Sequence, residues 1–193
     1  MIFLPDVNIW IALTSNRHVH HSLATECLQG IENEQIAFCR ISELSFLRLL
    51  TNAHVMGKDV LSPVEAWLVY DEWRTDDRVI FLPERAEFGE EWRQLGGKIA
   101  GGPNVRTDAY LAVFASHTNA TVITLDRKFP PLGKGAIKSL IWRRRLFFPQ
   151  KRHCRVCHRV IHRISRHRIS HPDTARTASW SSIQVRLAIH QRP

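Results

Sequence analysis

The sequence lacks any apolar run of the ~18 residues that a helix needs to cross a bilayer, so we expect no membrane-spanning segment. It also lacks a basic start followed by a long apolar stretch, so we expect no secretory signal and a cytoplasmic location. Only four cysteines occur in 193 residues, and in a reducing compartment they need not pair. This length allows one well-buried domain with a tail, but hardly two full domains.

Acidic residues are almost absent from the last quarter of the chain. Residues 141–193 contain 13 Lys and Arg but a single acid, Asp173, for a net charge of +12. Residues 1–140 contain 14 Lys and Arg against 17 Asp and Glu, for a net charge of −3, and the two parts sum to the +9 of the whole chain. The basic character therefore belongs to the tail and says little about what the folded part binds.

Short apolar runs alternate with helical patterns over the first 141 residues. The expected strands are Ile2–Leu4, Ile36–Cys39, Val79–Leu82, Thr121–Leu125 and Ile137–Ile141. The expected helices are Asn8–Leu13, His20–Gln29, Ser42–Thr51, Pro63–Arg74, Glu84–Leu95 and Asp108–Thr118. This alternation predicts the α/β class, with a central and mostly parallel sheet covered by helices.

Two of these helices have recognisable starts. Ser62 and Glu65 form a capping box, and Pro63 stands at the first helical position between them. Thr107 is expected to cap the helix that opens at Asp108.

Four acidic residues occupy special places in this pattern. Asp6 and Asp126 each follow an expected strand, whereas Glu43 and Asp108 stand near the start of expected helices. Open α/β sheets bind ligands beyond the carboxyl ends of their strands, so the four carboxylates could converge at one edge. Clustered carboxylates repel one another unless a cation compensates, and magnesium prefers such oxygen ligands. Each residue taken alone is more readily explained by helix capping, and only the set of four favours a metal site.

Four segments resemble VapC-type toxins of the PIN family in order and spacing. They are Leu4-Pro5-Asp6-Val7-Asn8-Ile9-Trp10, Ser42-Glu43-Leu44-Ser45-Phe46-Leu47-Arg48-Leu49-Leu50, Thr107-Asp108-Ala109-Tyr110-Leu111-Ala112 and Thr124-Leu125-Asp126-Arg127-Lys128-Phe129. The resemblance covers about residues 1–141 and implies a PIN-like three-layer sandwich. It also implies an endoribonuclease that needs Mg²⁺, for which Mn²⁺ may substitute, a cognate antitoxin as partner, and often a homodimer.

Matching positions carry the family's roles onto this chain. Asp6, Glu43, Asp108 and Asp126 would be the catalytic and metal-site residues, and a metal-activated water would attack the RNA phosphate in line. Two neighbouring polar residues, Asn8 and Thr124, would orient them, while Arg127 and Lys128 would contact the RNA backbone. A rival hypothesis is a non-catalytic RNA-binding protein that uses the PIN-like fold and the basic tail. It predicts binding that survives chelation, without cleavage.

Residues 142–193 form an Arg- and His-rich basic tail without sustained periodicity, which we expect to be disordered or at best conditionally folded. Cys154, Cys157 and His158 match a haem-attachment pattern, and with His167 and His171 the same cysteines suggest a zinc module, although the spacing is short. The tail could instead be a basic RNA-binding arm, or a frame-shifted or read-through extension. The abrupt change in composition favours an extension, which predicts that deleting residues 143–193 leaves nuclease activity intact.

Overall fold

Five short parallel strands form the centre of the structure, which is a computed structural model that describes residues 1–97, 105–127, 129, 136–139 and 156–162. The strands are β1 (Ile2–Pro5), β2 (Gln35–Phe38), β3 (Val79–Phe81), β4 (Ala120–Thr124) and β5 (Ala136–Ser139). Their order across the sheet is β3-β2-β1-β4-β5, and every pair is parallel. The α/β class and a parallel central sheet are therefore confirmed, with each strand within two residues of its predicted bounds.

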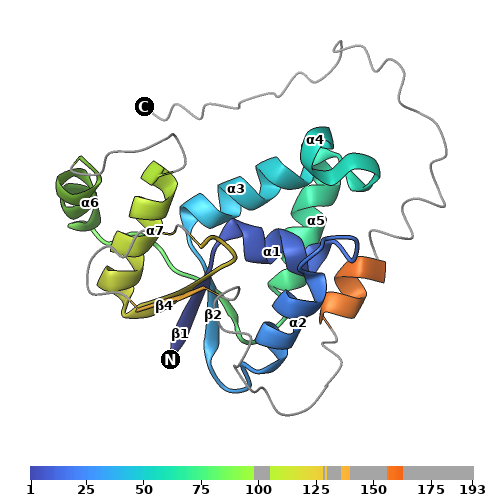
Figure 1. The fold of residues 1–193 in the computed structure, drawn as a ribbon, viewed down its shortest axis with the longest axis horizontal. Coiled ribbons are helices and arrows are strands. Elements are labelled where there is room, and N and C mark those ends of the chain that lie inside the picture. Colours follow the sequence, from blue (N-terminus) through green and yellow to red (C-terminus); the bar gives the residue numbers. More distant parts are fainter. Residues whose placement is uncertain (98–104, 128, 130–135, 140–155, 163–193) are drawn as a thin grey trace, which may run out of the picture.

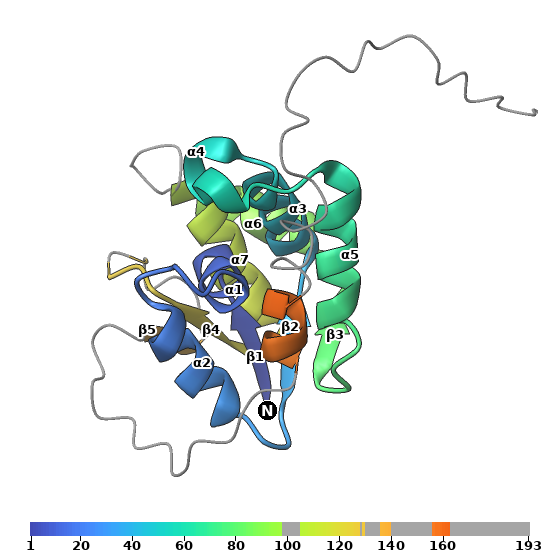
Figure 2. The same ribbon diagram turned by 90° about the vertical axis from the view of Figure 1, so that its right-hand side faces the viewer.

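Helices cover both faces of this sheet (Figures 1 and 2). They are α1 (Val7–Thr14), α2 (His21–Gln29), α3 (Arg40–Leu50), α4 (Ala53–Met56), a 3-10 turn η1 (Gly57–Asp59), α5 (Pro63–Trp73), α6 (Phe88–Gly96) and α7 (Val105–Thr118). Figure 1 shows α6 and α7 on one side of the sheet and α1, α2, α3 and α5 on the other. This is the three-layer arrangement that the resemblance implies.

The alternation of side chains along the strands divides the core into two clusters. Phe3, Phe38 and Ile123 point toward the layer of α1, α2, α3 and α5. Leu4 and Val122 point the other way, into the cluster built by α7 and Phe88 of α6. Because neighbouring residues of a strand face opposite sides, a one-residue shift in register would exchange the two cores.

Several helix boundaries differ from the prediction. The capping box of Ser62 and Glu65 is present at the start of α5, as predicted. The predicted cap at Thr107 is wrong, because α7 begins at Val105 and Thr107 lies inside its first turn. The short α4 and η1 were not predicted, since four- and three-residue elements are too short to show a period.

The predicted tail is described only at residues 156–162, which form a helix. Val156, Cys157 and Val160 of this helix are buried and belong to the larger core cluster. The other tail residues named for metal or haem binding, Cys154, His167 and His171, lie outside the described residues. Across the described part of the chain, no helix is both long and apolar enough to cross a membrane.

Candidate active site

Asp6 lies where β1 passes into α1, at the carboxyl end of the central strand of the sheet. Its backbone is extended, and its side chain caps α1 by accepting a hydrogen bond from the Val7 N–H at 2.6 Å. The second carboxylate oxygen accepts from Asn8 Nδ2 at 2.6 Å and from Thr124 Oγ1 at 2.9 Å. The residue is 7% exposed, so this carboxylate is buried, capped and held in one orientation.

Thr124 and Asn8 join the ends of β1 and β4. Thr124 is fully buried at the last position of β4, and its hydroxyl also accepts from the Asp126 N–H at 3.0 Å. Asn8 donates to Thr124 Oγ1 at 3.1 Å and accepts from the Leu125 N–H at 3.1 Å. These bonds fix the turn after β4 against Asp6.

Asp108 and Asp126 reach the same neighbourhood from other elements. Asp108 lies in the first turn of α7, and Asp126 is exposed just after β4. The left-handed backbone of Asn119 (φ 56°) ends α7 and lets β4 begin at the next residue, so Asp108 and Asp126 lie just inside the start and just beyond the end of one continuous α7–β4 unit. The negative charges of Asp6 and Asp126 act on Asp108, and the charge of Asp126 also acts on Asp6.

Burial and mutual repulsion disfavour charge on these carboxylates. Burial is the main cause that raises the pKa of Asp108 to about 6, and the charges of Asp6 and Asp126 add to it. The pKa of Asp6 is also raised, chiefly by burial and to a lesser degree by Asp126, while the bonds from Thr124 and Val7 oppose the shift. Among the described residues, no basic side chain forms a salt bridge with Asp6 or Asp108. Within the described structure, Asp6 and Asp108 therefore have no ion pair that would relieve the repulsion between their charges.

Glu43, the fourth predicted carboxylate, has a different environment. It is 5% exposed in the first turn of α3, where Arg40 forms an ion pair with it three residues earlier. The Arg40 guanidinium also lies over the Phe81 ring, 4.8 Å from its centroid. Burial together with the neighbouring Glu43 raises the pKa of Tyr70 to about 12. Glu43 is thus already neutralised by a cation that the sequence reasoning missed, although the i, i+3 spacing to Arg40 could have indicated it.

The donor chemistry of the three aspartates fits a hard divalent cation. As the side chains stand, no three His, Cys, Asp or Glu side chains among the described residues are grouped closely enough to enclose a metal ion. Magnesium does not require such a cage, because it usually keeps several waters and binds one or two carboxylates directly. Three carboxylates at one sheet edge, two of them without a basic partner in the described structure, match that mode of binding.

A cavity of about 740 Å³ lies between α6 and the start of α7. Trp92, Arg93 and Arg106 line it, together with Glu90 and Gln94. The Trp92 ring packs edge-on against Tyr110, with centroids 5.8 Å apart, and remains 38% exposed. The sequence reasoning missed this cavity. It expected RNA contacts from Arg127, which is exposed, and from Lys128, which lies outside the described residues.

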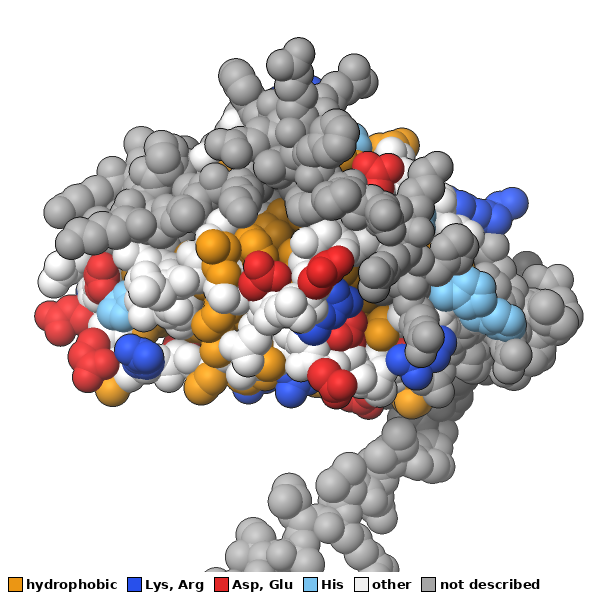
Figure 3. Space-filling view, turned by 90° about the horizontal axis from the view of Figure 1, so that it is seen from below, with side chains coloured by type: hydrophobic (Ala, Val, Ile, Leu, Met, Phe, Trp, Pro, Cys, Tyr) orange, Lys and Arg blue, Asp and Glu red, His pale blue; other side chains and the backbone are white. Residues whose placement is uncertain are grey.

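On the lower face of the molecule, carboxylates and basic side chains are interspersed with hydrophobic ones (Figure 3). The described part of this face has no extended basic surface of the kind that binds nucleic acid through charge alone.

Comparison with known proteins decides the family. The PIN domain family model matches residues 3–134. A curated relative, Ribonuclease VapC41 of Mycobacterium tuberculosis, is 36% identical over 137 residues, which cover 68% of this chain and 94% of the relative. The chain belongs to the VapC family of PIN-domain proteins. Another VapC relative, VapC ribonuclease Mb2897 of Mycobacterium bovis, is 31% identical over 84 residues, or 44% of this chain and 56% of that protein.

Solved VapC structures share the fold. Mycobacterium tuberculosis VapC20, described as a sarcin-ricin loop cleaving toxin, superposes with a TM-score of 0.52 at 14% identity and covers 69% of this chain and 99% of its own. A chain of the Rickettsia felis VapBC2 structure, which is bound to a promoter DNA fragment, superposes with a TM-score of 0.50 at 17% identity. The match covers 72% of this chain and 98% of that one. At these identities the likeness establishes the PIN fold of the VapC-family chain and nothing finer.

Proposed function

We propose that this VapC-family chain is the endoribonuclease toxin of a toxin–antitoxin pair, and that it hydrolyses RNA with Mg²⁺, for which Mn²⁺ can substitute. The observation that carries the proposal is the approach of Asp6, Asp108 and Asp126 at the carboxyl edge of the sheet, where the charges of Asp6 and Asp126 add to the effect of burial in raising the pKa of Asp108, and the charge of Asp126 adds to it for Asp6. The 36% identity to a curated VapC ribonuclease supports the same activity. A bound magnesium ion would supply a polarised water and positive charge for the reacting phosphate.

Each polar residue has a distinct task in this proposal. Asp6, held by Thr124 and Asn8, offers a carboxylate of fixed orientation to the ion. Asp108 and Asp126 would help to hold the ion, and either carboxylate could accept a proton from water. Glu43 is the fourth acidic residue of the site, and its ion pair with Arg40 compensates its negative charge.

The cavity at α6 and α7 fits single-stranded RNA better than a duplex. An exposed indole can stack on an unpaired base, and two arginines can contact phosphates on either side of it. Arg106 lies on α7, two residues before Asp108, so a strand bound there would run beside the acidic centre. Arg127 and Lys128 are proposed to add contacts to the RNA backbone.

The proposed partners are an antitoxin and a second copy of this chain. The solved VapBC structures, whose PIN fold this chain shares, support an antitoxin. The homodimer is expected from the family resemblance alone.

The direct test is to incubate the purified protein with total bacterial RNA in Mg²⁺, Mn²⁺ or EDTA, with Asp6→Asn alongside. Discrete fragments that need the metal and disappear in the variant are expected, and mapping their ends identifies the target. RNA that is bound equally well in EDTA and never cleaved would contradict the proposal and favour a non-catalytic RNA-binding protein.

A further inference from the structure

The helix at residues 156–162 lies beyond the part of the chain that the PIN family model matches, which ends at residue 134. Figure 2 shows this helix, drawn in orange, between α2 and α5, and Figure 1 shows it on the outer side of the same two helices. Its buried residues Val156, Cys157 and Val160 belong to the same core cluster as Trp73 of α5 and Leu28 of α2. A segment outside the family domain thus extends the core of that domain.

Three apolar residues of this helix are removed from solvent. Val156 and Cys157 are 5% and 4% exposed, and Val160 is fully buried. The intervening His158 and Arg159 are exposed, so the helix is amphipathic, with Val156 and Val160 one turn apart on its inner face. A seven-residue helix has little stability of its own in water, so its formation depends on this apolar contact.

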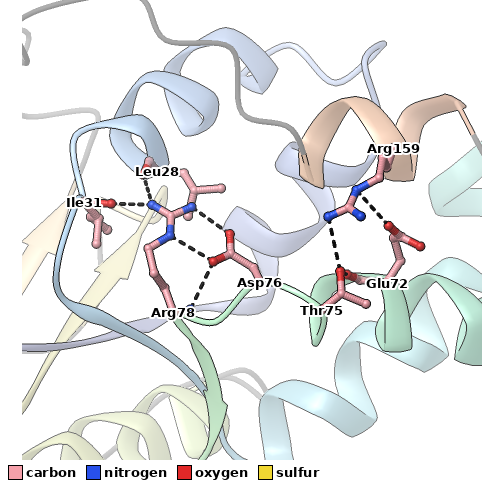
Figure 4. Close-up of polar contacts among 7 residues, drawn as sticks. All are labelled: Leu28, Ile31, Glu72, Thr75, Asp76, Arg78 and Arg159. Atoms are coloured by element: carbon pink, nitrogen blue, oxygen red, sulfur yellow. Dashed lines mark hydrogen bonds and ion pairs between the residues drawn. The ribbon is translucent and has the colours of Figure 1, made fainter.

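Arg159 adds a polar contact with the end of α5 (Figure 4). Its Nε lies 3.2 Å from Glu72 Oε1, and its NH2 group donates to Thr75 Oγ1 at 3.5 Å. Arg159 also lies close enough to Asp76 to help lower the pKa of that carboxyl, although the main favourable contact of Asp76 is with Arg78. The negative charge at the end of α5 is therefore complementary to the positive charge of Arg159, the one arginine among residues 156–162.

The surface beneath the helix is rigidly built. Arg78 pairs with Asp76 at 2.7 Å and donates to the carbonyl oxygens of Leu28 and Ile31 (Figure 4). Arg78 thereby links the end of α2 to the segment between α5 and β3. The distance between the α2 side and the α5 side of the apolar surface is fixed by these contacts. Such a preformed surface can bind a short helix without reorganising itself.

We propose that the apolar surface between α2 and α5 is a helix-docking site, and that the chain's own residues 156–162 occupy it. The site takes an amphipathic helix with two adjacent apolar residues, a third one turn further on, and a basic residue opposite Glu72. By filling this site, the tail helix stabilises the α2–α5 side of the domain and keeps other amphipathic helices from it. On this proposal the tail is an intramolecular ligand and not merely an added extension.

The test uses the full chain with Val160→Asp and a matched control, His158→Asp, which places the same carboxylate on the exposed side of the same helix. Val160→Asp is expected to lower the melting temperature by ~5 °C or more, because it forces a charge into the apolar contact, whereas the control changes it little. Hydrogen exchange should show protected amides in the last turn of the helix at residues 156–162, where the N–H groups can bond within the helix, in the wild type and the control, and loss of that protection in Val160→Asp. Equal melting temperatures for the two variants would overturn the proposal.

Reversing the charges of Arg159 and Glu72 tests whether the helix docks in this specific orientation or is held by apolar burial alone. Arg159→Glu and Glu72→Arg should each weaken protection of residues 156–162, and the double variant should recover part of it. Alkylation of Cys157, located by mass spectrometry, should be slow in the wild type and at least about tenfold faster in Val160→Asp, because the thiol is buried only while the helix is docked. A Cys157 that reacts equally fast in both proteins would contradict the proposal.

Dilution of the protein shows whether the docked helix belongs to the same chain or to a second copy. Protection that is independent of protein concentration is expected if the helix docks on its own chain. Protection that disappears on dilution, together with a fall in molecular mass from dimer to monomer, would assign the helix to a second copy and overturn the intramolecular docking. None of these measurements depends on nuclease activity.

Discussion

Asp108→Asn is expected to stabilise the metal-free protein while abolishing its activity. A folded-state pKa of about 6, against 3.8 for the free side chain, corresponds to a shift of about 2 units, or a ceiling of ~3 kcal/mol. Asp108 is partly exposed, so solvent screening reduces this to ~1–1.5 kcal/mol. For a chain of this size the expected rise in melting temperature is ~2–6 °C at pH 7.5 in EDTA.

The pH dependence of the folding stability tests the direction of this effect. The raised pKa means that the folded protein holds a proton on Asp108 that the unfolded chain has released, between about pH 4 and pH 6. Wild-type stability from this group is fully present below pH 4 and is lost as the pH rises through 6. The advantage of the variant should therefore appear above pH 6 and shrink toward pH 4. Thermal unfolding across this range measures it, with exposed Asp71→Asn as control. A variant that is no more stable than the wild type at pH 7.5, or whose advantage persists at pH 4, would refute the reasoning.

Three further substitutions test individual contacts. Thr124→Val should lower the free energy of unfolding by ~1–3 kcal/mol in urea denaturation, because the hydroxyl bonded to Asp6 is lost, and should reduce RNA cleavage roughly 10–100-fold. Glu43→Gln should reduce cleavage less than Asp108→Asn in the same assay, because Arg40 already neutralises the glutamate; an equal loss would show that Glu43 serves the reaction as directly as Asp108. Trp92→Ala should raise KM for single-stranded RNA roughly tenfold with kcat little changed, whereas the same substitution at Trp67, which is more exposed, should leave both constants unaltered.

The sequence was sufficient to predict the architecture because the fold depends on alternation. Strands such as Thr121–Leu125 appear as short apolar runs between helical patterns, and the structure places β4 within one residue of that range. Asp6 and Asp126 could be placed at the carboxyl edge for the same reason, because each directly follows a strand. The start of α7 was misplaced because Val105 and Arg106 have no distinctive capping signal, whereas Thr107 has one.

Contacts between distant segments were beyond the reach of sequence patterns. The ion pair of Arg159 with Glu72 joins residues 87 positions apart, and a contact over that distance leaves no periodic pattern in the sequence. The helix that carries Arg159 spans only seven residues, too few to show a helical repeat within an Arg- and His-rich tail. The cavity beside Trp92 likewise arises from the packing of α6 against α7 and not from a motif.

The most direct test of the central claim is the binding of Mn²⁺, followed by electron paramagnetic resonance, to the wild type, to Asp6→Asn, Asp108→Asn and Asp126→Asn, and to Asp71→Asn as control. If the three aspartates form the cation site, the wild type and the control bind Mn²⁺ alike, Mg²⁺ displaces it, and the site variants bind it at least about tenfold more weakly. Binding that is unchanged in all three site variants would contradict the account, because the cation would then lie elsewhere.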